Sequence, residues 1–245
     1  QSGREYMGWC WRANGGTTSS NTDGASTTTV QANTAAGFSI VEFPNYTSNS
    51  TFGHGLNSAP EFIIVKLTAS TSRWAVYHTG LTSAAYYISL NTSDGEATGT
   101  FFNSTAPTAS VFSLGASFGG SGAGIAYCWH SVEGYSKFGK YTANGNADGP
   151  FIYTGFKPAF IILKKTSDTA NWMMYDNKRE GYNVDNDHLK PNTNEAEGTS
   201  DDLDILSNGF KLRTSGSGEN SGNFIYMAIA ENPIVGSNNV PAVAR

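Results

Sequence analysis

The sequence predicts an all-β protein made of two tandem antiparallel β-sandwich modules, jelly-roll or lectin-like, that arose by internal duplication. A pattern of aromatic and apolar residues recurs after about 98 residues, which is the size of a small domain. Charged residues make up only 14% of the chain, and Gly, Ser, Thr and Asn are abundant, as expected for short strands with many turns. No segment keeps a helical apolar period over more than two turns.

The repeat is clearest in two apolar strands that follow a proline. Residues 62–65 read Phe-Ile-Ile-Val after Pro60, and residues 160–163 read Phe-Ile-Ile-Leu after Pro158. Proline cannot donate to a β ladder, but it is tolerated where a strand begins. We therefore expect one complete module at residues 37–134 and a second at residues 135–233.

Short strands are expected at equivalent places in the two modules. In the first module they are residues 38–43, 62–67, 74–78, 111–114 and 125–130. Turn signals such as Asp94-Gly95 and Asn208-Gly209 separate them. Residues 17–36 are polar and of low complexity, which indicates a linker or an edge segment. Residues 234–245 form a C-terminal tail.

The first residues of the chain contain a further partial copy of the repeat. Trp9-Cys10-Trp11 is similar to Tyr127-Cys128-Trp129, so residues 1–16 are expected to hold the terminal strand of an upstream repeat. That strand could pair within the chain or complete the sheet of a neighbour. Equivalent cysteines in different repeats need not lie close together, so two buried free thiols are favoured over a disulfide.

Composition and motifs exclude several classes of function. The net charge is −5 and the basic residues are scattered, which argues against a nucleic-acid partner. The longest apolar runs have the length of strands and fall short of the roughly 18 residues that a membrane helix needs, so no membrane insertion is expected. The sequence has no Gly-x-Ser-x-Gly motif and no metal-ligand spacing of histidines, so we expect no enzyme.

Candidate binding residues lie where the two modules differ, because variable loops on a fixed framework carry specificity. The longest difference is between residues 79–90 and residues 177–194. Tyrosine rings there could stack on a sugar while amides and carboxylates bind its hydroxyls; the alternative is that the tyrosines pack under their own loops. The predicted glycan-binding residues are Tyr86, Tyr87, Tyr182, Asn183, Asp185, Asn186, Asp187 and His188.

The second loop opens an acidic segment. Seven of the chain's 20 carboxylates lie within residues 185–204. Asp185 and Asp187 offer the hard oxygen ligands that Ca²⁺ prefers, without the complete loop of an EF-hand. The alternative is a solvated loop, or one whose carboxylates pair with cations such as Lys178, Arg179 or Lys190. Calcium is the only cofactor to consider.

Several framework motifs together resemble a known family. They lie at residues 8–16, 53–56, 125–130, 135–141, 153–158, 207–213 and 226–233. As a set they resemble the tandem β-modules found at the C-terminal ends of tail-fibre and other virion proteins of marine bacteriophages. Members of that family usually have Tyr-Thr-Gly-Asn-Gly where this chain has Ala143 in the third place, which alters one turn. The resemblance implies a viral structural protein and supplies no catalytic residue.

The expected function follows from this resemblance. It implies a virion protein, the distal part of a tail or head fibre, used for host attachment and receptor binding through a cell-surface glycan or lipopolysaccharide. Its partners would include other virion proteins, and its likeness to fibres implies a homo-oligomer such as a trimer. One alternative is a purely architectural protein, a capsid decoration or a fibre shaft. Another is a virion-associated polysaccharide depolymerase that uses carboxylates of residues 185–204.

Overall fold

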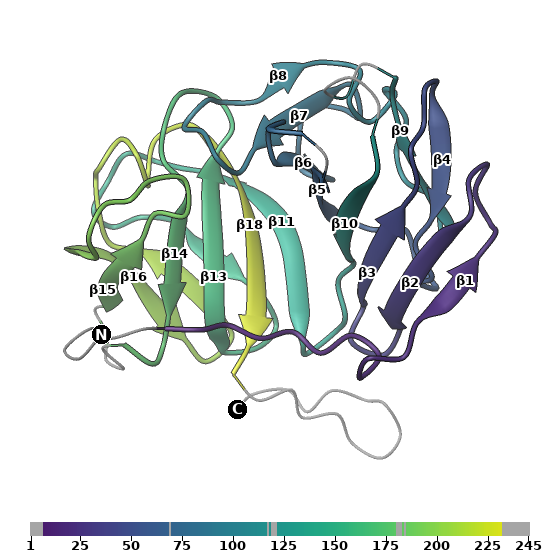
Figure 1. Ribbon diagram of the computed structural model, residues 1–245. Coiled ribbons are helices and arrows are strands. Elements are labelled where there is room, and N and C mark those ends of the chain that lie inside the picture. Colours follow the sequence, from purple (N-terminus) through teal and green to yellow (C-terminus); the bar gives the residue numbers. More distant parts are fainter. Residues whose placement is uncertain are drawn as a thin grey trace, which may run out of the picture.

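The apolar runs of the sequence form strands that are buried on both faces. The computed structural model describes residues 7–68, 70–116, 118, 122–179, 183 and 185–231, without the side chains of Asp185, Asn186 and Asp201. This part of the chain contains strands and no helix. It therefore also contains no helix long and apolar enough to cross a membrane. Two eight-stranded antiparallel sheets and one two-stranded sheet make an all-β, sandwich-like fold (Figure 1).

The first large sheet lies in the N-terminal half of the chain. Its strands, in spatial order, are β1 (Ser19–Asn21), β2 (Thr28–Asn33), β3 (Phe38–Phe43), β10 (Gly124–Trp129), β5 (Phe62–Leu67), β6 (Ala75–His78), β7 (Tyr86–Ser89) and β8 (Ala97–Thr98). The two-stranded sheet pairs β4 (Ser50–Gly53) with β9 (Val111–Leu114). The expected strands at 38–43, 62–67 and 111–114 have these bounds. The strand expected at 74–78 begins one residue later, and the strand expected at 125–130 begins and ends one residue earlier.

The second large sheet lies in the C-terminal half. Its order is β11 (Ser136–Thr142), β18 (Asn223–Ala230), β13 (Pro158–Lys165), β14 (Met173–Asp176), β15 (Asp185–Leu189), β16 (Gly198–Leu206), β17 (Gly209–Leu212) and β12 (Phe151–Tyr153). The order β3-β10-β5-β6-β7-β8 of the first sheet has the same pattern of connections as β11-β18-β13-β14-β15-β16. The pair β4·β9 likewise corresponds to β12·β17.

Each half has a core of its own, and a third apolar cluster joins the halves. The N-terminal core includes Val41, Phe52 and Ile63, and the C-terminal core includes Ile161 and Tyr175. The third cluster, the shared core, takes residues from both sheets: Ala13, Phe38, Phe62, Val76, Leu81, Ile88, Trp129, Phe138, Phe160, Ile162, Trp172, Ile225 and Met227. Alternate residues of a central strand thus serve two cores, which explains its continuous apolar sequence.

A lysine at equivalent places in β5 and β13 closes the loop that follows each strand. Lys66 donates to the carbonyls of Ser70 and Ser72 at 2.7 and 2.9 Å. Lys164 is fully buried and donates to the carbonyls of Lys165 and Ala170, both at 2.9 Å, and to that of Ser93 in the other half at 3.2 Å. Burial lowers the pKa of Lys164 to about 8.

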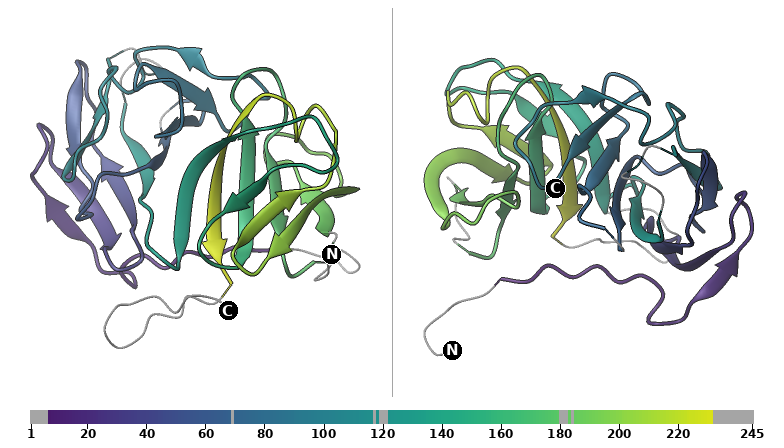
Figure 2. Two further views of the ribbon diagram at one scale, coloured as in Figure 1. Left: turned by 180° about the vertical axis from the view of Figure 1, so that it is seen from behind. Right: turned by 45° about the horizontal axis from the view of Figure 1, so that its top comes forward.

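The N-terminal segment differs from its expected conformation. Residues 7–16 form no strand; they run below both sheets (Figures 1 and 2). Trp9 and Trp11 pack against the shared core, with ring centroids 5.6 and 5.4 Å from that of Phe160. Because these two rings turn inward, Cys10 between them is exposed, so the expectation of two buried thiols holds only for Cys128. Burial of apolar rings, and not pairing with a sheet, fixes this segment.

The polar segment at residues 17–36 lies at the edge of the first sheet. It carries β1 and β2, and β2 pairs with β3 through five residues from Thr29 to Asn33. Between these strands, Ser26 forms a parallel bridge to Phe52 of β4. The segment therefore covers an edge of both sheets in the N-terminal half. The expected tail at residues 234–245 lies outside the described residues.

Candidate functional site

The two predicted tyrosines of the first loop do not form one platform. Tyr86 and Tyr87 are neighbours in β7, so their side chains point to opposite faces. Tyr86 packs on the shared core and Tyr87 on the N-terminal core. The guanidinium of Arg73 lies 5.4 Å from the Tyr87 ring centroid and donates to its hydroxyl at 3.1 Å. Both rings are half-buried and face opposite sides of the strand, so one sugar cannot stack on both of them.

The residues predicted in the second loop also separate. Tyr182 lies outside the described residues, and for Asp185 and Asn186 only the strand, and not the side chain, is described. Asn183 binds β16 from its edge: its amide donates to the Ile205 carbonyl at 2.8 Å and accepts from the Ile205 N–H at 2.9 Å. Asp187 and His188 are neighbours in β15 and therefore point to opposite faces.

His188 is buried beside a small polar network in the C-terminal half. Its Nδ1 lies 3.0 Å from Oδ2 of Asp202. The ring N–H is not aligned with that oxygen, so the contact is electrostatic and not a hydrogen bond. Asp202 also accepts from the Tyr175 hydroxyl at 3.1 Å and the Ser200 hydroxyl at 3.0 Å. These contacts hold β14, β15 and β16 together and leave His188 turned away from solvent.

A glycine makes room for the His188 ring. A Cβ atom added to Gly198, which pairs with His188, would overlap the imidazole. We expect Gly198→Ala to lower the free energy of unfolding by about 1–3 kcal/mol, because the ring must leave its buried position. Thermal unfolding followed by circular dichroism measures this change, and Gly218→Ala is the control, since its Cβ would meet no atom within 4 Å. A melting temperature unchanged by Gly198→Ala would contradict the assigned contact.

Part of the acidic segment pairs with cationic side chains. Glu195 pairs with Lys190 at 2.6 Å and Glu197 with Arg179 at 2.5 Å. Arg179 also contacts Asp176 at 2.7 Å. These carboxylates raise the pKa of the guanidinium, against the effect of its burial. Arg179 and Lys190, which were expected from the sequence as pairing partners, thus form ion pairs with this segment. Within the described residues, no group of three or more metal-ligating side chains occurs.

The most exposed aromatic side chains of the described chain lie elsewhere, on β12. Phe151 is 46% exposed and Tyr153 is 61% exposed, while Ile152 between them is buried in the C-terminal core. Because strand side chains alternate, the two rings stand on the same outer face. A rigid strand thus presents two neighbouring rings to solvent, the aromatic pair.

The matching strand of the N-terminal half has no such rings. Ile152 pairs with Phe210, as Phe52 of β4 pairs with Phe112, so the aromatic pair corresponds to Thr51 and Gly53. Both positions are covered by the polar edge segment. The N–H of Ala25 donates to the Thr51 hydroxyl at 2.8 Å, and the Asn21 side chain occupies the place of a Cβ on Gly53. The framework therefore does not require aromatic residues at these places.

The surroundings of the aromatic pair are open and polar. Gly209 lies opposite Tyr153 and contributes no side chain, and Lys211 lies opposite Phe151. The Lys211 ammonium contacts the exposed Asp148 carboxylate at 2.6 Å, which lowers the pKa of that carboxyl. The sequence does contain a signal for this site: Phe-Ile-Tyr places large side chains on both faces of a strand in an outer layer. The predicted site in the variable loops does not include these two residues.

Comparisons with known proteins identify a domain family but no activity. A family model described as a domain of unknown function (DUF7483) matches residues 1–233. No curated protein and no solved structure matches the chain. The geometry of the described residues therefore carries the functional argument.

Proposed function

Because the chain belongs to the DUF7483 domain family, which has no assigned function, we propose a function from its geometry: a non-enzymatic phage virion protein that attaches to host-surface glycan. The observation that carries this proposal is the aromatic pair Phe151 and Tyr153, exposed on a strand whose counterpart is covered. The virion location and the tail or head fibre come from the family resemblance of the sequence motifs.

The aromatic pair suits a sugar chain chemically. The face of an aromatic ring is electron-rich and attracts the C–H groups on one side of a pyranose, which adds about 0.5–1.5 kcal/mol per ring to the burial of apolar surface. Lys211 and Asp148 beside the rings offer a donor and acceptors to hydroxyl groups. One such site would bind weakly, and many copies on a virion, such as trimeric fibres, would provide avidity.

The finer architecture belongs to the same proposal. The matching strand orders and the repeat of about 98 residues support two duplicated jelly-roll or lectin-like modules. In this view the first module has gained the polar edge segment, which covers β4. The described part of the second module has no such segment, and the equivalent surface is available to the ligand.

The test is a glycan array with the purified chain and matched variants. Phe151→Ala/Tyr153→Ala is expected to weaken binding about tenfold or more, because two stacking contacts are lost. Tyr153→Phe keeps the ring and is expected to retain binding. A chelator in parallel tests the calcium proposed at Asp185 and Asp187. Unchanged binding of the double variant would refute the aromatic pair as the site, whatever the ligand.

An architectural role is the second candidate, because β12 is an edge strand of its sheet. Exposed apolar rings at a sheet edge also suit a neighbouring virion protein. If this role is the right one, the folded chain binds no glycan, and the double variant instead loses its place in the assembled particle.

A further inference from the structure

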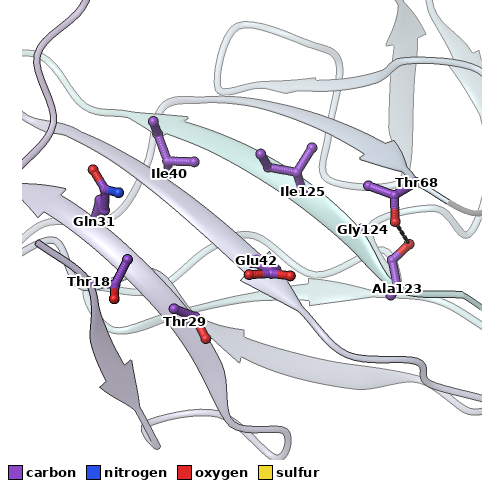
Figure 3. A pocket seen from close by; sticks show the side chains of 9 residues that line it. All are labelled: Thr18, Thr29, Gln31, Ile40, Glu42, Thr68, Ala123, Gly124 and Ile125. Carbon is purple, nitrogen blue, oxygen red and sulfur yellow. Dashed lines mark hydrogen bonds between the residues drawn. The ribbon is translucent and has the colours of Figure 1, made fainter. Parts of the chain in front are cut away.

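A shallow hollow lies on the face of the first sheet that is turned toward the other half. It has a volume of about 220 Å³. Figure 3 shows the side chains of Ile40 and Ile125 on two neighbouring strands, with those of Gln31, Thr29 and Glu42 nearby. These residues belong to β2, β3 and β10, at the end of the sheet beyond the shared core.

A second hollow of about 350 Å³ lies between the two halves. Lys140 and Thr142 of β11 and Asn223 of β18 line it from the C-terminal half. Glu96 and Thr82 line it from the N-terminal half. Its volume falls in the range of small-molecule sites, and most of its named side chains are polar.

The two hollows occupy the same place in the repeated strand pattern. In the first, Glu42 of β3 pairs with Ile125 of β10; in the second, Lys140 of β11 pairs with Ile225 of β18. Thr68 lines the first hollow and Thr166, at the equivalent position after β13, lines the second. At equivalent positions, the lining side chain has thus changed from a carboxylate (Glu42) to an ammonium (Lys140).

Each hollow is lined by a charged side chain, Glu42 or Lys140, that forms no ion pair with another described residue. Among the ion pairs of the described residues, none includes Glu42 or Lys140. Glu96 shares the second hollow, but it accepts from the Thr82 N–H at 2.9 Å and from the Thr82 hydroxyl. Its carboxylate is therefore held by Thr82 and keeps its negative charge, while the Lys140 ammonium has no ion pair among the described residues and can bind an anionic ligand.

We propose that the two hollows are a duplicated sugar site with inverted charge selectivity, in which the Lys140 hollow holds a carboxylate-bearing sugar. This inference goes beyond the glycan binding proposed above, because it assigns sugar sites separate from the aromatic pair and names the chemical class of their ligand. The Lys140 ammonium pairs with the carboxylate, while Thr142 and Asn223 bind hydroxyl groups. The Glu42 hollow repels the same carboxylate and takes an uncharged sugar through Gln31 and Thr29.

The test is a titration of the intact chain with glucuronate, glucose and inorganic phosphate, followed by ligand-observed NMR and calorimetry. Lys140→Glu is expected to weaken glucuronate binding about tenfold or more, because attraction becomes repulsion. Glu42→Lys, the matched exchange, is expected to add a second glucuronate site. Glu96→Gln is expected to tighten glucuronate binding, and Phe151→Ala/Tyr153→Ala to leave it unchanged.

Three results would overturn the inference. Glucuronate binding that does not respond to Lys140→Glu would remove Lys140 from the site. Glucose binding as tight as glucuronate in the Lys140 hollow would remove the charge selectivity. Phosphate binding as tight as glucuronate would reduce the hollow to a general anion site without sugar recognition. Since Glu42 and Lys140 are both exposed, the fold should survive both exchanges. None of these results affects glycan binding at the aromatic pair.

Discussion

Replacing Trp172 with alanine is expected to lower the free energy of unfolding by about 3–5 kcal/mol, the usual cost of removing a fully buried large aromatic side chain. Trp172 is 1% exposed and belongs to the shared core. Its indole N–H donates to the Ser89 carbonyl of the other half at 2.9 Å. The variant therefore leaves a cavity between the halves and an unpaired carbonyl. Urea unfolding followed by tryptophan fluorescence and circular dichroism measures the loss.

The chain supplies the control, because Trp74 is the repeat equivalent of Trp172. Trp74 is only half-buried, so Trp74→Ala should cost less than half as much. Because the shared core joins the halves, wild-type unfolding is also expected to be a single transition. Equal losses in the two variants, or a wild-type protein whose halves unfold separately, would contradict the role given to the shared core.

Much of the fold could be predicted because its signals are local. Pro60 and Pro158 mark strand starts, and alternation and turns fixed the strands at 38–43, 62–67 and 111–114 to the residue. The packing of the halves on each other was not predicted, although a signal exists. Residues 62–65 are apolar at four consecutive positions, and a strand needs that only when both of its faces are buried. The second face here is the shared core.

The candidate site was harder to predict because exposure depends on what covers a surface. Tyr86 and Tyr87 are adjacent in the sequence. In a strand, adjacent side chains point to opposite faces, so the two rings cannot form one platform if this segment is a strand. Phe151 and Tyr153 have the spacing of one strand face, but only the structure shows that nothing in the described chain covers them. The covering of Thr51 and Gly53 is likewise visible only in the structure, because the residues that cover them lie about 25 positions earlier in the sequence.

Acid is also expected to lower the free energy of unfolding, through protonation of His78 between the two halves. This residue ends β6 and is 1% exposed. The Gly80 N–H donates to its Nδ1 at 2.8 Å, so the neutral ring carries its proton on Nε2 and donates to the Tyr226 carbonyl of the other half at 3.1 Å. Burial, with a smaller contribution from the Lys140 charge, lowers the pKa of His78 to about 4. Protonation would place an unpaired positive charge at the boundary of the shared core.

The sign of the pH effect follows from linkage. Between pH 6.5 and about 4 the unfolded state binds the proton and the folded state does not, so the stability from His78 is complete above pH 6.5 and is lost toward pH 4. A difference of about 2.5 pKa units corresponds to about 3 kcal/mol. His54, whose pKa burial also lowers, adds to this loss. Glu219 opposes it, because burial raises its pKa and acid then favours the folded form.

Comparison of the wild type with His78→Gln isolates the residue from these other groups. The Gln amide can still donate toward the Tyr226 carbonyl but does not titrate, so the variant should lose stability at neutral pH and depend less on pH between 6.5 and 4. Urea midpoints at half-unit pH steps measure both slopes. Parallel slopes in the two proteins would show that His78 binds no proton on unfolding, and that acid acts on the fold through other groups. A flatter slope in the variant would show that acid destabilises the protein at the shared core, since the lowered pKa of His78 lies in this pH range and its ring hydrogen-bonds to the other half.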